Sequence, residues 1–133
     1  MANALYDLGR EAFLTGSINY ASDNIKVALV DTAVYTVNLA THDFLSDVSG
    51  IIATSGNLAS KTTTAGVADA ADITITGVSN TSIEALVIYK DTGVAGTSNL
   101  IAYIDTGTGL PFQTNGGDVT IVWDSGANRI FKL

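Results

Sequence analysis

The sequence contains no cysteine, one proline and one histidine among its 133 residues. The absence of cysteine excludes disulfide bridges, zinc sites built on thiolates and a catalytic thiol. A chain of this length forms one domain of ordinary size, whose core is large enough to fold without a disulfide or a metal ion. We therefore expect a single β-rich domain over residues 1–133, with neither metal nor cofactor.

Charge is also scarce. Charged residues make up 14% of the chain, against about 25% in typical globular proteins. Six scattered lysines and arginines among 13 acidic residues give a net charge of −7 and cannot form the basic face that nucleic-acid binding requires. Because uncharged threonine, serine and asparagine replace the missing charge, we expect another protein to cover part of the surface.

The sequence also lacks long apolar segments. No run approaches the about 18 apolar residues that mark a membrane-spanning helix. The first ten residues lack the basic region and the following apolar stretch of a secretory signal peptide. We therefore expect neither membrane insertion nor secretion by this route.

The N-terminal segment has the spacing of a helix over residues 3–15. Asn3 is its expected N-cap and Gly16 the glycine expected after its last turn. Gly9 in its interior costs up to about 1 kcal/mol relative to alanine, and a helix this short is marginal alone. We therefore expect a helical arm over residues 1–16 that docks on its own sheet or on a neighbouring subunit. Three apolar residues share one face of this helix: Leu5, Leu8 and Ala12.

The rest of the chain has the pattern of short strands joined by turns rich in glycine, threonine and serine. Two apolar runs, Ile25–Val30 and Ile83–Tyr89, are typical of strands buried in a sheet. Ile73–Thr76 alternates between isoleucine and threonine, as half-buried strands do. Val119, Ile121 and Trp123 alternate with Thr120, Val122 and Asp124 in a further strand. Further strands are expected at Lys61–Thr64, Leu100–Ile104 and Arg129–Leu133. One helical turn is expected at residues 41–47, a loop at 65–72, and turns at 91–98, 115–117 and 124–128, with Pro111 between two strands.

This spacing of strands predicts the fold class. The fold is expected to be mainly β, either an antiparallel β-sandwich or a small barrel, with a short N-terminal helix. No domain boundary, linker or internal repeat is visible in the sequence.

The only histidine, His42, lies near Ser46 and two aspartates, Asp43 and Asp47. A Ser–His–Asp triad needs a nucleophile, a base and an orienting carboxylate within hydrogen-bond reach, and residues so close in sequence rarely build one. We interpret His42 as a surface or capping residue.

Three pairs of carboxylates could lie close together across turns, and a glycosidase needs two carboxyls about 5–9 Å apart in a cleft. Aspartates beside glycine usually shape turns instead, so we assign no catalytic residue and expect no enzymatic activity. Calcium remains an open alternative, although no Asp-x-Asp-x-Asp-Gly run occurs. The pairs are Asp69 with Asp72, Asp105 with Asp118, and Glu84 with Asp91.

Two further features have a simpler structural explanation than a functional one. The run from Asn115 to Asp118 is rich in glycine, but it precedes a strand and has no lysine nearby, so it is not a phosphate-binding loop. Trp123 alternates with core residues, and we expect it to pack in the core and not to stack on a ligand.

Stretches spread over nearly the whole chain carry a further signal. They are Ala4–Asp7, Gly9–Glu11, Phe13–Leu14, Gly16, Ile25–Thr32, Phe44–Asp47, Ala65–Ala70, Glu84–Gly93, Leu100–Asp105, Gly116–Asp118 and Ile130–Leu133. Together they resemble a family of tailed-bacteriophage and prophage proteins of similar length, usually uncharacterised or described as virion structural proteins. The resemblance carries no catalytic signature.

The resemblance implies a virion protein that is made in the cytoplasm of the bacterial host. A small, acidic, β-rich chain suits a capsid decoration (cement) protein, which binds the major capsid protein in many copies and often forms trimers. The alternative placement is the tail, neck or a fibre. Two other classes stay open: a hydrolase of cell-wall or surface glycans that uses Asp105 or Asp118, and a host-surface adhesin.

For an assembly protein, we expect subunit contacts from both ends of the chain, the helix at residues 3–15 and the strand at Arg129–Leu133. The alternative is that these side chains pack within their own domain. The apolar residues expected to make the contacts are Leu5, Leu8, Phe13, Ile130, Phe131 and Leu133.

Overall fold

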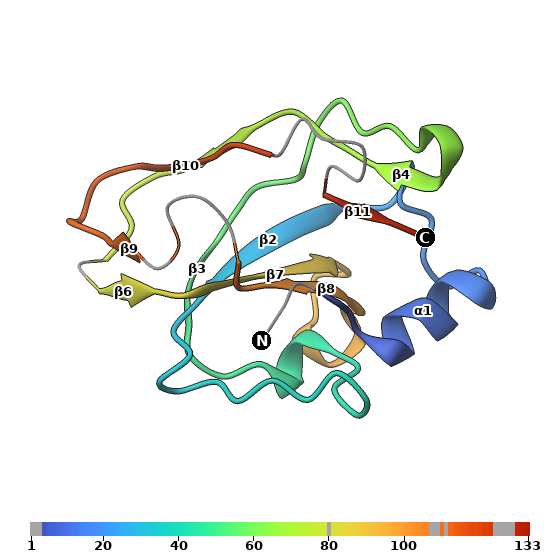
Figure 1. The fold of residues 1–133 in the computed structure, drawn as a ribbon, viewed down its shortest axis with the longest axis horizontal. Coiled ribbons are helices and arrows are strands. Elements are labelled where there is room, and N and C mark those ends of the chain that lie inside the picture. Colours follow the sequence, from blue (N-terminus) through green and yellow to red (C-terminus); the bar gives the residue numbers. More distant parts are fainter. Residues whose placement is uncertain (1–3, 80, 107–109, 111, 124–129) are drawn as a thin grey trace.

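The structure is a computed structural model that describes residues 4–79, 81–106, 110, 112–123 and 130–133. At its centre is an antiparallel sheet in the order β1-β8-β7-β2-β3 (Figure 1). The predicted mainly β, antiparallel fold with an N-terminal helix is confirmed, and the sheet does not close into a barrel. The five strands are β1 (Ala4–Leu5), β2 (Ile25–Val30), β3 (Ile51–Thr54), β7 (Ala85–Lys90) and β8 (Leu100–Ile104).

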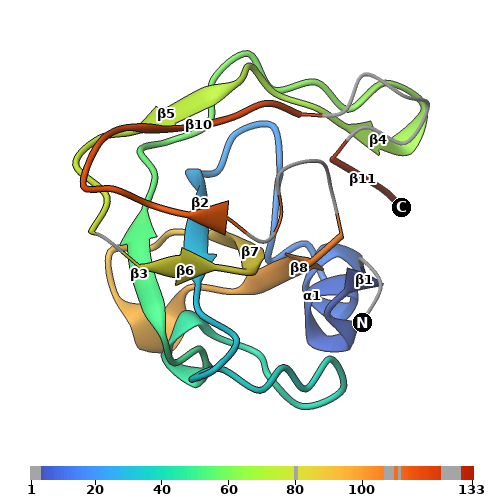
Figure 2. The same cartoon turned by 60° about the vertical axis from the view of Figure 1, so that its left-hand side comes forward.

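Shorter strands pair into three two-stranded ribbons. The ribbons β4–β11 and β5–β10 lie above one face of the large sheet, and β6–β9 lies near one end of it (Figures 1 and 2). They form a partial second layer, so the fold has the layering of a sandwich with one broken sheet. The ribbon strands are β4 (Val67–Ala68), β5 (Ile73–Ile75), β6 (Ser82–Ile83), β9 (Phe112–Gln113), β10 (Val119–Ile121) and β11 (Phe131–Lys132).

The large sheet is buried on both faces, which explains its nearly continuous apolar strands. In β2, Val27 and Leu29 face the core beneath the ribbons, whereas Ala28 and Val30 face a second core on the other side. In β7, Ile88 faces the first core and Val87 the second. Successive side chains of a strand point to opposite faces, so each central strand contributes to both cores.

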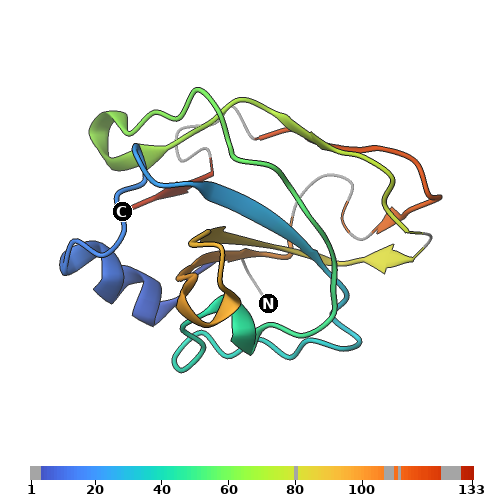
Figure 3. The same cartoon turned by 180° about the vertical axis from the view of Figure 1, so that it is seen from behind.

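The second core is covered by residues 31–50, which we call the strap. Figure 3 shows the strap on the side of the sheet opposite β4 and β5. Its regular structure is one short 3₁₀ turn, Leu45–Asp47, within the segment predicted to form a helical turn. Tyr35 and Val48 are its buried side chains. Two other 3₁₀ turns lie outside the strap, at Thr64–Gly66 and Ala95–Thr97.

The helix is shorter than predicted. Helix α1 covers Asp7–Leu14 with Tyr6 as its N-cap, and Leu5 lies in β1, where it pairs with Ala102 of β8. The predicted start at residue 3 was therefore wrong, because pairing along the sheet edge fixes the preceding residues in extended backbone. Asn3 itself lies outside the described residues.

The end of the helix was predicted correctly. Gly16 adopts a φ of 78°, which a residue with a Cβ rarely takes. The Gly16 amide donates to the Phe13 carbonyl and the Ser17 amide to the Ala12 carbonyl, at 3.2 and 2.8 Å. These two bonds form a Schellman motif that satisfies carbonyls at the end of α1.

Other strand predictions divide into matches and corrections. The strands β2 and β8 have the predicted bounds, and β7 lies in the middle of the sheet. Lys61–Thr64 is not a strand, since Thr62 makes only an isolated bridge to Asp69, and the predicted loop at 65–72 contains β4 instead. Pro111 and residues 124–129 lie outside the described residues.

Candidate functional site

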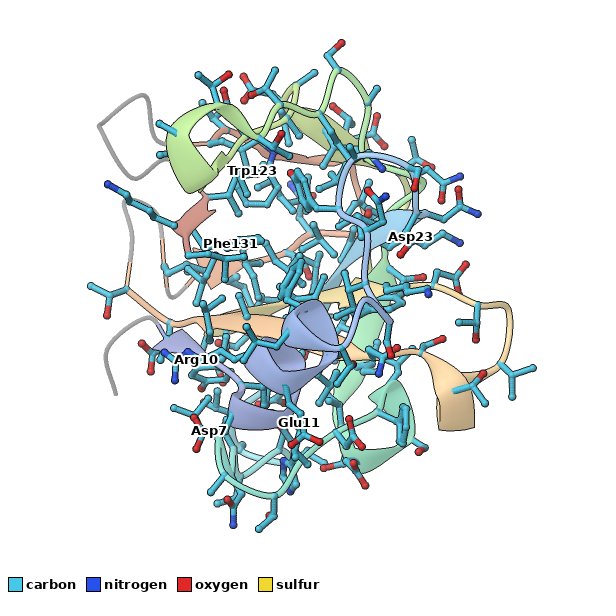
Figure 4. The ribbon with its side chains drawn as sticks, turned by 90° about the vertical axis from the view of Figure 1, so that its right-hand side faces the viewer. Asp7, Arg10, Glu11, Asp23, Trp123 and Phe131 are labelled. Carbon is cyan, nitrogen blue, oxygen red and sulfur yellow. The ribbon has the colours of Figure 1, made fainter. Side chains whose placement is uncertain are left out.

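The segments predicted to make subunit contacts come together at one end of the molecule. Figure 4 looks onto this end, where α1 lies beside β11. The rings of Phe13 and Phe131 are 6.1 Å apart, and the ring of Tyr20 meets Phe131 edge-on at 5.6 Å. These aromatic contacts join α1 and the loop after it to the last strand, β11.

Most of the six predicted contact side chains face inward. Ile130 and Phe131 are each 9% exposed and belong to the core beneath the ribbons, and Leu5 and Phe13 are half-buried against the same core. Leu8 is half-buried beside a pocket. Leu133 alone among the six exposes most of its surface, at 61%.

Sequence analysis missed Leu14, which is 89% exposed on the last turn of α1. The helical period could have revealed it, because Leu14 is an apolar residue off the face that Leu8 and Ala12 share. We call the exposed pair Leu14 and Leu133, together with half-buried Phe13, the α1–β11 surface. Exposed leucines are common one at a time, so what distinguishes this surface is that two chain ends supply it.

Charged groups on the outer side of α1 lie close to this surface. The Arg10 guanidinium meets the Asp7 carboxylate at 2.9 Å, and both side chains are more than half exposed. Such a pair contributes about 0–1 kcal/mol. Figure 4 shows it with Glu11 on the helix, so α1 presents mixed charge beside an apolar end.

A pocket of roughly 160 Å³ opens between α1 and the strap. Carboxylate and hydroxyl side chains make up much of its lining. Burial raises the pKa of Asp43, and the negative charges of Asp47 and Glu11 raise it further. Among the described residues, no group of three or more histidine, aspartate or glutamate side chains is arranged to hold a metal ion. The pocket is lined by Leu8, Glu11, Ala12, Thr15, Ser17, Asp43 and Asn99.

His42 forms part of a buried hydrogen-bond chain instead of a catalytic triad. Its Nδ1 lies 2.8 Å from the Tyr35 hydroxyl, which lies 2.9 Å from the hydroxyl of fully buried Tyr6. The Asp47 carboxylate accepts the amides of Asp43 and Phe44, and these two bonds lower its pKa. Ser46 is exposed on the 3₁₀ turn. His42 was interpreted as a surface or capping residue; it is half-buried, and its Nδ1 accepts the Asn38 amide at 3.3 Å.

The carboxylates considered for catalysis mostly serve the backbone. Asp72 accepts the Trp123 amide and Asp118 the Gly77 amide. Glu84 accepts the Thr32 amide at one end of β7, whereas Asp91 binds Lys26 at the other end, 2.7 Å away. A strand of six residues separates this last pair by about 20 Å, so Glu84 and Asp91 cannot act on one substrate group. Trp123 is half-buried against the core, as predicted.

Lysines near the start of β2 are engaged with acidic or carbonyl groups. Lys90 lies 3.4 Å from the Asp23 carboxylate, and Lys61 donates to the Asp23 carbonyl. Lys26 contacts Asp91, and this contact is the main cause that lowers the pKa of the Asp91 carboxyl. In the described part of the chain these lysines are thus matched with oxygen partners within the same chain.

The Tyr6–Tyr35–His42 chain makes a specific prediction about stability. Tyr35→Phe should reduce the free energy of unfolding by about 1–3 kcal/mol, because the buried Tyr6 hydroxyl then loses its hydrogen-bond partner. Tyr6→Phe should cost less, because Tyr35 keeps its hydrogen bond to His42. Urea unfolding of both single variants and the double variant at pH 7.5 measures the coupling. A Tyr35→Phe variant as stable as the parent would contradict the hydrogen-bond chain.

No protein-family model matches the chain, and no curated protein matches it in sequence. None of the helices in the described residues combines the length and the apolar character needed to cross a bilayer.

Proposed function

We propose that the chain is a structural protein of a bacteriophage virion, most specifically a decoration protein that binds the outer capsid shell in many copies. The proposal rests on the resemblance that extends over nearly the whole sequence. The observation that supports a role in assembly is the convergence of both ends of the chain on the α1–β11 surface, where Leu14 and Leu133 are exposed.

The proposed mechanism is burial of apolar surface at junctions between shell subunits. Burial stabilises an interface by about 25 cal/mol per Å² before the costs of association. The rigid sheet, packed on both faces, presents the α1–β11 surface with little loss of conformational entropy. Repetition over many equivalent sites would then strengthen the shell, and a trimer would multiply the contacts of each unit.

The alternative placement in the tail, neck or a fibre differs in stoichiometry. A decoration protein is present in hundreds of copies per particle, whereas a tail or neck component is present in a dozen or fewer. Light scattering of the purified protein measures its oligomeric state, for which we expect a trimer. The copy number per particle, measured by mass spectrometry of purified virions, and the oligomeric state together separate the two placements.

A double variant tests the proposed contact surface. Leu14→Asp with Leu133→Asp should weaken binding to capsids that lack the protein by at least about tenfold, because each carboxylate must be desolvated in the interface. The change is expected in co-sedimentation with such capsids, while the melting temperature stays near that of the parent. Unchanged binding would show that this surface is not the contact.

The control is Val94→Asp, at a side chain that is 61% exposed, like Leu133, but lies in the turn after β7. It introduces one negative charge, against two in the double variant, at the exposure of Leu133 and away from α1 and β11. We expect its binding to match that of the parent protein, so a general effect of added negative charge would be recognised.

A further inference from the structure

The turn between β9 and β10 contains the one asparagine of the chain that is followed by a glycine, Asn115 before Gly116. Both residues are exposed. Gly116 has a φ of 85°, a conformation that glycine adopts without steric cost. Because Gly116 has no side chain, its backbone nitrogen is open to approach the side-chain amide carbon of Asn115. The turn therefore presents a nucleophile and an electrophile on one exposed dipeptide.

A hydrogen bond orients the side-chain amide of Asn115. Its Oδ1 accepts the Gly117 amide at 3.0 Å. A donor at this oxygen draws electron density away from Cγ and stabilises the negative charge that develops on the oxygen when Cγ is attacked. Within the described part of the chain, the Gly116 amide donates no hydrogen bond, so no such contact has to break before its nitrogen reacts.

The residues on either side hold this turn in place. Thr114 is buried, its Oγ1 accepts the Thr81 amide at 2.8 Å, and its own amide donates to the Thr81 carbonyl at 2.8 Å. On the other side, the Gly117 carbonyl accepts the Val78 amide at 2.9 Å. The exposed pair Asn115 and Gly116 thus lies between two fixed points, which keep the Gly117 amide beside the Asn115 side chain.

We propose that Asn115 is a site of spontaneous deamidation in the folded protein. The Gly116 nitrogen forms a bond to Cγ of Asn115, the bond from Cγ to Nδ2 breaks, and Nδ2 leaves as ammonia with the proton that the Gly116 amide gives up. Water then opens the resulting cyclic imide at either of its carbonyls, which yields aspartate or isoaspartate. The reaction consumes one water molecule and releases one ammonia, and the inference does not depend on the proposed function.

The product changes both the charge and the backbone of the turn. Each product carries a new carboxylate near Asp118, whose own carboxylate accepts the Gly77 amide at 3.2 Å. In isoaspartate the backbone runs through the former side chain, which adds a methylene group between Thr114 and Gly117. Since these two residues are anchored, the isoaspartate form should unfold at lower urea concentration than the parent protein.

Peptide mapping by mass spectrometry after incubation at mildly alkaline pH tests the proposal in the folded and the urea-unfolded protein. Asn38 is the internal control: it is exposed, and its Oδ1 likewise accepts the amide two residues on, that of Ala40, at 3.1 Å, but Leu39 follows it. In the folded protein Asn115 should deamidate at least about tenfold faster than Asn38, a barrier difference of about 1.4 kcal/mol. An intact Asn115 in the folded protein, under conditions that modify it in urea, would overturn the proposal.

Gly117→Ala tests the part played by the turn, because it leaves the Asn115–Gly116 sequence unchanged. A Cβ at position 117 would lie 2.9 Å from Oδ1 of Asn115, and this exposed side chain can rotate away, so the variant should fold. The displaced oxygen loses its hydrogen bond, and deamidation of the folded variant should slow by about two- to tenfold. In urea the variant and the parent should react equally. Equal rates in the folded proteins would overturn the assignment of this reactivity to the turn.

Discussion

Gly9→Ala should lower the free energy of unfolding by about 1–3 kcal/mol, even though alanine favours a helix by about 1 kcal/mol over glycine. The reason is the close approach of α1 to β8. A Cβ on Gly9 would overlap the Leu100 carbonyl oxygen and lie 3.3 Å from the Ile101 Cα. Both are backbone atoms of a central sheet strand and cannot rotate away.

Urea unfolding monitored by circular dichroism measures this change. Gly96→Ala is the matched control, because no atom lies within 4 Å of a Cβ at that position and its φ is not in the left-handed region. The control should differ from the parent by less than about 0.5 kcal/mol. If Gly9→Ala were neutral or stabilising, α1 would not pack on β8 as closely as described.

Ile88→Ala should destabilise the protein by about 2–5 kcal/mol, the usual cost of a large-to-small change in a core. Ile88 is fully buried in β7, the middle strand of the sheet, and faces the core beneath the ribbons. Neighbouring strands hold its surroundings on both sides, so the cavity cannot collapse. Since small domains have about 5–15 kcal/mol of total stability, the loss should be visible as a large shift in the urea midpoint.

Ile52→Ala provides the comparison, since it removes the same atoms from β3, at the edge of the same sheet. Ile52 is half-buried against the same core. We expect it to cost less than half as much as Ile88→Ala, because water already reaches part of the side chain and the edge can relax. Equal losses at the two positions would contradict the central place of β7.

The sequence predicted those elements whose signal is local. The apolar runs of β2 and β7 are buried on both faces and need no partner to be recognised. The glycine at position 16 marked the end of α1 because its backbone conformation is local too. The start of α1 failed because Leu5 has helical spacing but is fixed by pairing to Ala102. That competition between helix and sheet depends on a strand almost a hundred residues away.

The candidate surface could be predicted only in part. Sequence analysis placed the contacts on the two chain ends, and the structure brings those ends together. It could not separate inward from outward residues, because Phe131 and Leu133 are two residues apart and would share one face of a strand. In the structure β11 ends at Lys132, so Phe131 is buried and Leu133, beyond the strand, is exposed. The Tyr6–Tyr35–His42 chain was invisible for the same reason: 29 residues separate the two tyrosines.

The proposed function is tested most directly by quantitative mass spectrometry of virions, purified from whichever phage or prophage proves to carry this sequence. The account predicts hundreds of copies per particle, in a fixed ratio to the major capsid protein. It also predicts that the chain can be removed from the particle while the tail stays attached. A dozen copies or fewer would move the protein to the tail, neck or fibre. Its absence from finished particles, with turnover of a substrate in infected cells, would contradict the account.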